Sequence, residues 1–247
     1  MTLDGVPVAQ LAPRWRAPHV GYHHRLASCL DALHELATAG ASAGTVVVGA
    51  EQLAGRGRED RHWHSPEGGV WLAVLFRPPV AAPGAVAIRA GMVVADAVDA
   101  LLQVPRAEVK WPNDVYLDGR KLAGVLCESR WLGDHLQWLA VGIGVNVCNP
   151  VPPELAGRAV SLCEVLPEVR RIDVLDLVVP ALDAVAAGSE PLTEAECVAF
   201  VARHRLEGRA IRAPVAGRVH GIASDGGLLV DTPAGRVTVR DGTVTPA

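Results

Sequence analysis

The sequence contains no apolar run long enough to cross a bilayer. Apolar stretches such as Val70 to Phe76 and Thr45 to Ala50 fall far short of the roughly 20 residues that a membrane helix needs. The first residues, Met1 to Pro18, mix prolines with charged residues and lack the apolar block of a secretory signal. We therefore expect a cytoplasmic protein with no membrane partner.

The chain has few cysteines and no excess of positive charge. The cysteines are odd in number and lack the paired spacing of a zinc site or a disulfide framework, so we expect isolated thiols at Cys29, Cys127, Cys148, Cys163 and Cys197. A formal net charge of -4 gives no electrostatic footprint for general nucleic-acid binding. DNA is therefore not an expected partner.

Apolar residues are abundant. They make up 50% of the 247 residues, against 20% charged residues, so the chain can bury a core large enough to offset its folding entropy. The length suits one sizeable domain with a small appendage. Apolar spacing predicts helices from Ser28 to Thr38 and from Ala85 to Leu102, and β-branched runs predict buried strands from Thr45 to Glu51 and from Val70 to Phe76.

The second half of the chain begins with several short strands. Extended segments are expected at 108–111, 115–117, 121–129 and 137–147, with Asp118-Gly119 as a hairpin turn. Helices follow at 173–187 and 194–203. Strands with few helices between them favour an α+β fold, in which a mixed, mostly antiparallel sheet packs with helices. After Gly208, short glycine-punctuated strands predict a small β-barrel, so we expect domains at 1–206 and 207–247.

Four segments carry residues suited to chemistry. In the loop Gly55-Arg56-Gly57-Arg58, glycines free the backbone and guanidinium groups can bind carboxylate or phosphate, although a mobile solvated loop has a similar composition. In Lys110-Trp111-Pro112-Asn113-Asp114, a proline bend sets a cation, an aromatic ring and a carboxylate close together. Alternatively, Trp111 is a core residue and Asp114 bonds the turn backbone.

The third and fourth segments are predicted strands. Alternation places Lys121 on one face with Ala123 and Val125, and places Gly124 on the other. In Gly142-Ile143-Gly144-Val145-Asn146, alternation leaves a face of two glycines and Asn146, which a flat ligand could approach. Close packing of a helix against these glycines would explain the same pattern.

Together and in this order, the motifs resemble the biotin protein ligase family, whose landmarks are a GRGRxGRxW loop, a KWPND element, a KLAG strand and a GxGxN strand. The resemblance covers roughly Ser28 to Asn146 by motif. It extends more weakly to the end, because Gly217 to Val244 resembles the small SH3-like cap of this family. The resemblance implies a class II synthetase-like catalytic domain and a ligase that activates biotin with ATP and Mg²⁺. The product, biotinyl-5'-AMP, would then biotinylate a lysine of a carboxylase biotin carboxyl carrier domain.

The resemblance also implies site residues. Lys121 would hold the biotin carboxylate and the transferring phosphate, Arg58 would hold the phosphate of the adenylate, and Asp114 would orient or deprotonate the acceptor amine. Trp63 would flank the adenine and Asn146 would bond it. The remaining positions expected to contact biotin or its adenylate are Ser28, Cys29, Gln52, Gly55, Arg56, Gly57, Gly124, Gly142 and Gly144.

The sequence departs from the family pattern in two places. Ser28-Cys29-Leu30 stands where the family carries Ser-Thr-Asn, whose hydroxyls bond the ureido head of biotin, and Glu59-Asp60-Arg61 places carboxylates beside the anion site. A ligase of the same fold acting on lipoate or another acid is therefore an alternative, and a noncatalytic biotin-binding module or regulator is a third. The segment before Ser28 is too short for a helix-turn-helix domain. His62 and His64 lack a further ligand at metal spacing, so no metal ligands are assigned.

Overall fold

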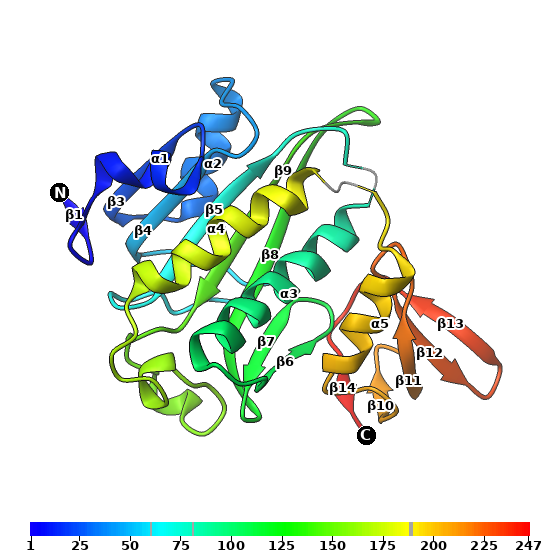
Figure 1. The fold of residues 1–247 in the computed structure, drawn as a ribbon. Coiled ribbons are helices and arrows are strands. Elements are labelled where there is room, and N and C mark those ends of the chain that lie inside the picture. Colours follow the sequence, from blue (N-terminus) through cyan, green and yellow to red (C-terminus); the bar gives the residue numbers. More distant parts are fainter. Residues whose placement is uncertain (60, 81, 188–189) are drawn as a thin grey trace.

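The computed structural model describes residues 1–59, 61–80, 82–187 and 190–247. Its centre is a seven-stranded sheet in the order β3-β4-β5-β9-β8-β7-β6 (Figure 1). Only the β3–β4 pair is parallel among the neighbours in this sheet, so the predicted mixed, mostly antiparallel α+β fold is confirmed. In sheet order the strands are Val20–Leu26, Val46–Gln52, Val70–Phe76, His135–Val145, Arg120–Leu132, Asp114–Leu117 and Ala107–Lys110.

Helices cover both faces of this sheet. On one face, α3 (Pro83–Leu102) and α4 (Arg171–Ala187) pack side by side, and on the other face α2 (Cys29–Thr38) lies across β4, β5 and β9 (Figure 1). Strand β5 shows why two covers are needed. Leu72 and Val74 join the large core under α3 and α4, whereas Trp71 and Ala73 join the core under α2. Every residue of β5 is therefore buried, as its continuous apolar run predicts.

The structure adds elements that periodicity does not predict. Strand β3 forms an edge of the sheet and carries His23, His24 and Arg25, all exposed, so its sequence lacks an apolar alternation. A short hairpin of β1 (Thr2–Leu3) and β2 (Val6–Pro7) and a short helix α1 (Leu11–Trp15) precede it. In the described part of the chain, no helix combines the length and apolar composition that a bilayer crossing requires.

The chain continues from α5 (Glu194–Arg203) into a five-stranded antiparallel sheet in the order β13-β12-β11-β10-β14. This sheet matches the small C-terminal β unit predicted after Gly208. A capping box at Thr193 and Glu196 begins α5 at the predicted residue. The strands, in chain order, are Ala210–Ala213, Gly217–Ile222, Leu228–Thr232, Gly235–Val239 and Thr245–Pro246.

Trp111 joins this C-terminal sheet to the large one. Its indole Nε1 donates a hydrogen bond of 2.8 Å to the carbonyl oxygen of Gly226, and its backbone N–H donates to Nε2 of His204 at 3.1 Å. Burial, followed by the nearby charge of Lys110, lowers the pKa of His204 to about 4. The imidazole is therefore neutral at pH 7 and free to accept this bond. The bond from Trp111 to Gly226 crosses the predicted boundary at residue 206, and that division stays a prediction.

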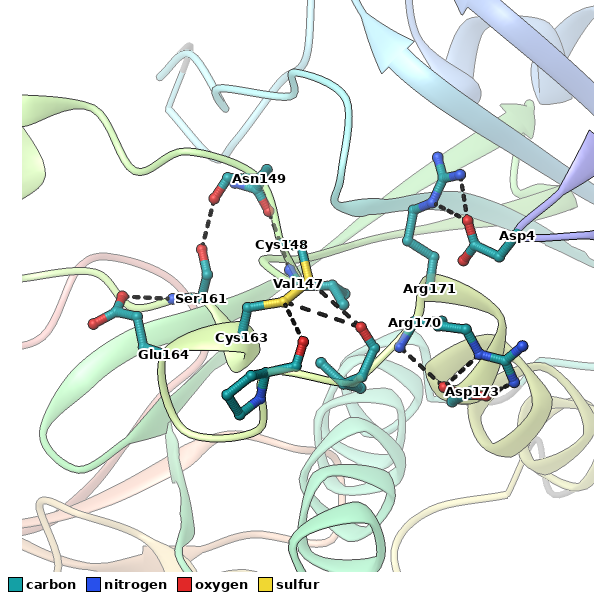
Figure 2. Close-up of a disulfide and its surroundings, with 12 residues drawn as sticks. Asp4, Val147, Cys148, Asn149, Ser161, Cys163, Glu164, Arg170, Arg171 and Asp173 are labelled. Atoms are coloured by element: carbon teal, nitrogen blue, oxygen red, sulfur yellow. Dashed lines mark hydrogen bonds and ion pairs between the residues drawn. A yellow bond between two sulfur atoms is a disulfide. The ribbon is translucent and has the colours of Figure 1, made fainter.

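A disulfide joins Cys148, just after β9, to Cys163 (Figure 2). The prediction of isolated thiols is wrong for this pair, whose Cα atoms are 5.2 Å apart, while Cys29, Cys127 and Cys197 are free thiols. Their approach depends on the loop between them, which folds back so that Cys163 N–H donates to the carbonyl of Val147. The spacing of the two cysteines in the sequence does not predict that this loop folds back.

Candidate active site

A cavity of about 480 Å³ opens on the α2 face of the sheet, among the predicted motifs. It is lined by the start of α2, the loop after β4, the chain around Asp114, the inner strands β8 and β9, and the C-terminal segment before β14. The structure brings these predicted site residues to its wall: Ser28, Cys29, Gln52, Arg56, Gly57, Arg58, Trp63, Asp114, Lys121, Gly124, Gly142 and Gly144.

Positive charge dominates this wall. Of the described residues around the cavity, Asp114 is the single carboxylate, against the six basic side chains of Arg56, Arg58, Arg61, Lys110, Lys121 and Arg158. Burial lowers the pKa of Lys110, although Asp114 opposes the shift. Such an excess of cations around one pocket attracts a polyanionic ligand.

Lys121 reaches the cavity because of a β-bulge. Its Nζ lies 2.6 Å from Oδ1 of Asp114 and 5.0 Å from the ring centre of Trp63. Simple alternation places Lys121 on the face opposite Gly124, and that prediction is wrong. The register between β7 and β8 shifts between Val115 and Tyr116, so one extra residue of β8 reverses the alternation. Lys121 and Gly124 thus line the same cavity.

The arginine loop, Gly55–Arg58, is the first arm of a small hairpin that Trp63 closes by donating its N–H to the carbonyl of Gly55. Gly55 does not line the cavity, but a side chain there would collide with the carbonyl of Trp63. Arg58 is turned to the C-terminal unit, where it pairs with Asp241 and donates to the carbonyl of Gly242 at 3.3 Å.

The glycine floor, Gly124 and Gly144, lies under the indole of Trp63. A Cβ on Gly144 would stand 2.5 Å from Nε1 of Trp63, and a Cβ on Gly124 would stand 3.2 Å from its ring. The Nε1 atom is buried and has no hydrogen-bond partner among the described residues. The flat face that the glycines create therefore holds a flat side chain in this structure.

The start of α2 forms another wall of the cavity. The hydroxyl of Ser28 accepts from Leu30 N–H at 3.2 Å and caps the helix, and Gln52 Oε1 accepts from Cys29 N–H at 2.8 Å. The Cys29 thiol donates to the carbonyl of Trp71 at 3.3 Å, and burial raises its pKa to about 12. Leu30 packs on Gly142, where an added Cβ would lie 3.0 Å from its side chain. These residues meet as predicted, but their polar groups are already hydrogen-bonded within the protein.

Asn146 stands outside the cavity wall. Its Oδ1 accepts from Nδ2 of Asn149 at 3.1 Å, and its backbone carbonyl accepts from Leu162 in the loop closed by the disulfide. The predicted contact between Asn146 and adenine therefore stays a prediction. The carboxylate of Glu59 accepts from the hydroxyl of Thr243 at 2.9 Å, so it is engaged with the C-terminal unit. Asp60, expected to oppose ligand charge, lies outside the described residues.

Comparison with known proteins settles the family. A profile described as the Biotin/lipoate A/B protein ligase family matches residues 27–146. Over 230 residues the chain is 32% identical to the Bifunctional ligase/repressor BirA of Bacillus subtilis, covering 88% of this chain and 70% of that protein. Over 222 residues it is 33% identical to the Biotin--[acetyl-CoA-carboxylase] ligase of Paracoccus denitrificans, covering 81% of this chain and 89% of that protein. The chain belongs to the biotin protein ligase family.

The fold agrees with solved members of the biotin protein ligase family. The structure of the Aquifex aeolicus biotin protein ligase in complex with biotin and ATP superposes with a TM-score of 0.80 at 26% identity, over 93% of this chain and all of that one. The predicted fold and the predicted enzyme class, a ligase, are therefore confirmed. The Bacillus subtilis relative carries the word repressor in its name, so the expectation that this ligase does not bind DNA stays a prediction.

This ligase site also includes residues that the motifs did not supply. Arg158 and Ala159 come from the disulfide-closed loop, which runs beside β8 so that Lys121 N–H donates to the carbonyl of Arg158 at 2.8 Å. Thr243 and Val244 come from the C-terminal unit. Neither segment has a compositional signal, because its place at the site depends on tertiary folding. Lys110 also lines the cavity, and because it lies in the motif Lys110–Asp114, the sequence could have predicted it as a site residue.

The described residues of this ligase hold no group of three or more His, Cys, Asp or Glu side chains close enough to bind a metal ion. Asp114 is the single carboxylate among the described residues that line the cavity, and it is paired with Lys121. A magnesium ion fits such a site only when substrate phosphates supply most of its ligands, as is common for Mg²⁺.

Proposed function

We propose that the chain is an ATP-dependent biotin protein ligase that forms biotinyl-5'-AMP with release of pyrophosphate. It then transfers biotin to a lysine of a carboxylase biotin carboxyl carrier domain. The observation that carries this proposal is the cavity wall with six basic side chains around a glycine floor. The ATP- and biotin-bound relative and the carboxylase ligase relative support the choice of substrates and of carrier protein rather than DNA as partner.

In the first half-reaction, a carboxylate oxygen of biotin attacks the α-phosphorus of ATP and pyrophosphate leaves. Lys121 is the catalytic cation in this proposal, because its ammonium can neutralise charge that develops at the transferring phosphate. Its present partner Asp114, at 2.6 Å, keeps the ammonium directed at the cavity. Arg58 would hold the adenylate phosphate once it exchanges Asp241 for the ligand.

In the second half-reaction, the amine of the acceptor lysine attacks the acyl carbon of the mixed anhydride, AMP leaves and the amine loses a proton. Asp114 would orient that amine or accept the proton, since its carboxylate faces the cavity beside Lys121. Trp63 lies with one face of its indole on Gly124 and Gly144, so it would stack on the adenine with its other face. Gln52 and the backbone of Gly57 would contact the adenylate from the opposite wall.

Magnesium would enter with ATP as the counter-ion of its phosphates. Asp114 is the residue that could contribute a ligand, and the bound ion would lower the negative charge of the leaving pyrophosphate. Basic side chains of the wall other than Arg56 would bind the remaining phosphate oxygens.

A second candidate is a ligase of the same mechanism that activates a different carboxylic acid. Leu30 favours it, because an apolar side chain covers Gly142 at the place where the family carries an asparagine. Acid-dependent exchange of labelled pyrophosphate into ATP, measured with biotin, lipoate and a series of fatty acids, decides between the two. Exchange with biotin supports the first candidate. If exchange occurs only with another acid, that acid replaces biotin as the proposed substrate. If no acid supports exchange, the proposed adenylation is refuted.

A further inference from the structure

Arg56 does not offer its guanidinium freely to the cavity. Its Nε and Nη2 donate to the two carboxylate oxygens of Glu128 at 3.2 Å each, and its Nη1 lies 2.8 Å from Oδ1 of Asp31. All three nitrogens of the guanidinium therefore have carboxylate partners. These partners belong to β8 and α2, so one side chain ties the arginine loop to both elements.

Glu128 is itself held in place from behind. Nε2 of His34 lies 2.9 Å from Oε2 of Glu128, and Nε1 of Trp138 lies 2.9 Å from Nδ1 of His34. Because an indole N–H can only donate, Nδ1 of His34 must accept, and Nε2 carries the proton that goes to Glu128. His34 and Arg56, the two donors to Glu128, lower the pKa of its carboxyl group, although burial partly opposes them.

The network follows from the local fold. Asp31 and His34 are three residues apart on α2 and therefore share a face of the helix. Glu128 lies opposite Ala140 in the sheet, two residues from Trp138, so both side chains emerge on the face under α2. The arginine loop crosses the gap between the helix and the strand, where Arg56 meets both carboxylates.

We propose that Glu128 is a positioning residue for the arginine loop: held by His34 and Trp138, it fixes Arg56 and so keeps Gly57 and Arg58 at the cavity wall. In this role Arg56 is a tether, and the expected phosphate contact falls to Arg58. Glu128 touches no reacting atom, since it stands behind Arg56 and is absent from the residues that line the cavity.

Hydrogen exchange tests the tether without any ligand. In the folded protein, Gly57 N–H donates to Arg61 and Trp63 N–H donates to Gly55, so both amides report whether the hairpin is closed. Glu128→Gln should speed exchange of these two amides about threefold to tenfold, because the lost ion pair is partly exposed and weaker than a buried one. The matched control is Glu35→Gln, which removes the same charge from α2, where Glu35 is exposed. Equal exchange in Glu128→Gln and the parent overturns the proposal.

A second experiment, on the kinetics of adenylate release, rests on the proposed function, whereas the hydrogen-exchange experiment does not. Release of biotinyl-5'-AMP should be about threefold to tenfold faster in Glu128→Gln than in the parent, with a smaller change in the rate of adenylate formation. Adding Glu128→Gln to Arg56→Met should cause no further loss, since both remove the same tether. Fully additive losses overturn the proposal.

His34→Phe removes both bonds of the imidazole and retains a ring, so it provides a second variant if Glu128→Gln does not fold. It should shift amide exchange and adenylate release in the same direction. Normal exchange in a folded His34→Phe variant would contradict the support that we assign to His34. Absence of biotin activation in every protein, with faster exchange in Glu128→Gln, would leave the tether standing and refute the proposed function.

Discussion

The double change Cys29→Thr with Leu30→Asn should make biotin bind more tightly. In the parent, Leu30 is 5% exposed and covers Gly142, and the Cys29 thiol is directed at the carbonyl of Trp71. Leucine offers no hydrogen bond and a thiol is a weak donor, so the ureido head of biotin meets little polarity from these two side chains.

The expected gain follows from burial. A ureido group that is buried without a partner costs about 1 to 3 kcal/mol, so a restored bond should lower the dissociation constant roughly tenfold to a hundredfold. A threonine hydroxyl at position 29 can keep the bond to Trp71, so most of the gain should come from Leu30→Asn. Leu30→Asn also removes a buried apolar side chain, which should lower the free energy of unfolding by about 1.5 to 3 kcal/mol.

Titration calorimetry with biotin and separately with ATP, on the parent, the two single variants and the double variant, measures the effect. Leu30→Ala is the control, because it loses the same packing without adding an amide. Tighter biotin binding in Leu30→Asn but not in Leu30→Ala, with unchanged ATP binding, is the expected result. Equal biotin affinity in all folded proteins would show that these positions do not read the ureido ring.

Four further outcomes are expected. Lys121→Ala should slow acyl-adenylate formation about a hundredfold to a thousandfold in pyrophosphate exchange, and a folded variant with full activity would refute its assignment. Arg58→Ala should speed adenylate release about tenfold or more in rapid mixing, since a charge-assisted bond is lost; an unchanged rate would count against that contact. Cys163→Ser should lower the free energy of unfolding, measured in urea, by about 3 kcal/mol, because the disulfide closes a loop of 15 residues. Reductant should lower the stability of the parent to the same value. Equal unfolding curves for the parent and the variant without reductant would contradict the disulfide. Hydrogen bonding to Arg89 lowers the pKa of Glu196 to about 2, so its stabilisation is present above the unfolded pKa of about 4.3 and lost as pH falls through 2. Glu196→Gln should therefore destabilise the protein by about 1 kcal/mol at pH 7 and by nearly nothing at pH 2, and a difference that persists at pH 2 would refute this reasoning.

The sequence predicts those elements whose pattern is local. The apolar run Val70–Phe76 is a fully buried strand, and the helix Glu194–Arg203 begins and ends as its spacing indicates. The Asp118-Gly119 turn also follows from local chemistry, since both residues take positive φ, 50° and 78°, as a two-residue hairpin requires. The motifs converge on one cavity because the turns and sheet order bring their strand ends together.

Features set by distant contacts escaped prediction. The polar edge strand Val20–Leu26 is held by its parallel pairing with β4 rather than by a buried face. The bulge that turns Lys121 into the cavity depends on the register with β7, and Cys148 meets Cys163 only after the intervening loop folds. Thr243 reaches the site from a separate sheet, with no motif of its own.

The close fit of Leu30 on Gly142 limits which substitutions positions 30 and 142 can accept. An alanine at position 142 would place a methyl group 3.0 Å from the Leu30 side chain, so it would be accepted only where residue 30 is smaller or turned aside. The same reasoning links Gly144 to Trp63, with a still shorter gap of 2.5 Å. Each pair should change together or not at all among related sequences. A larger residue at position 142 or 144 should appear only where the side chain packed on it, at position 30 or 63, has become smaller.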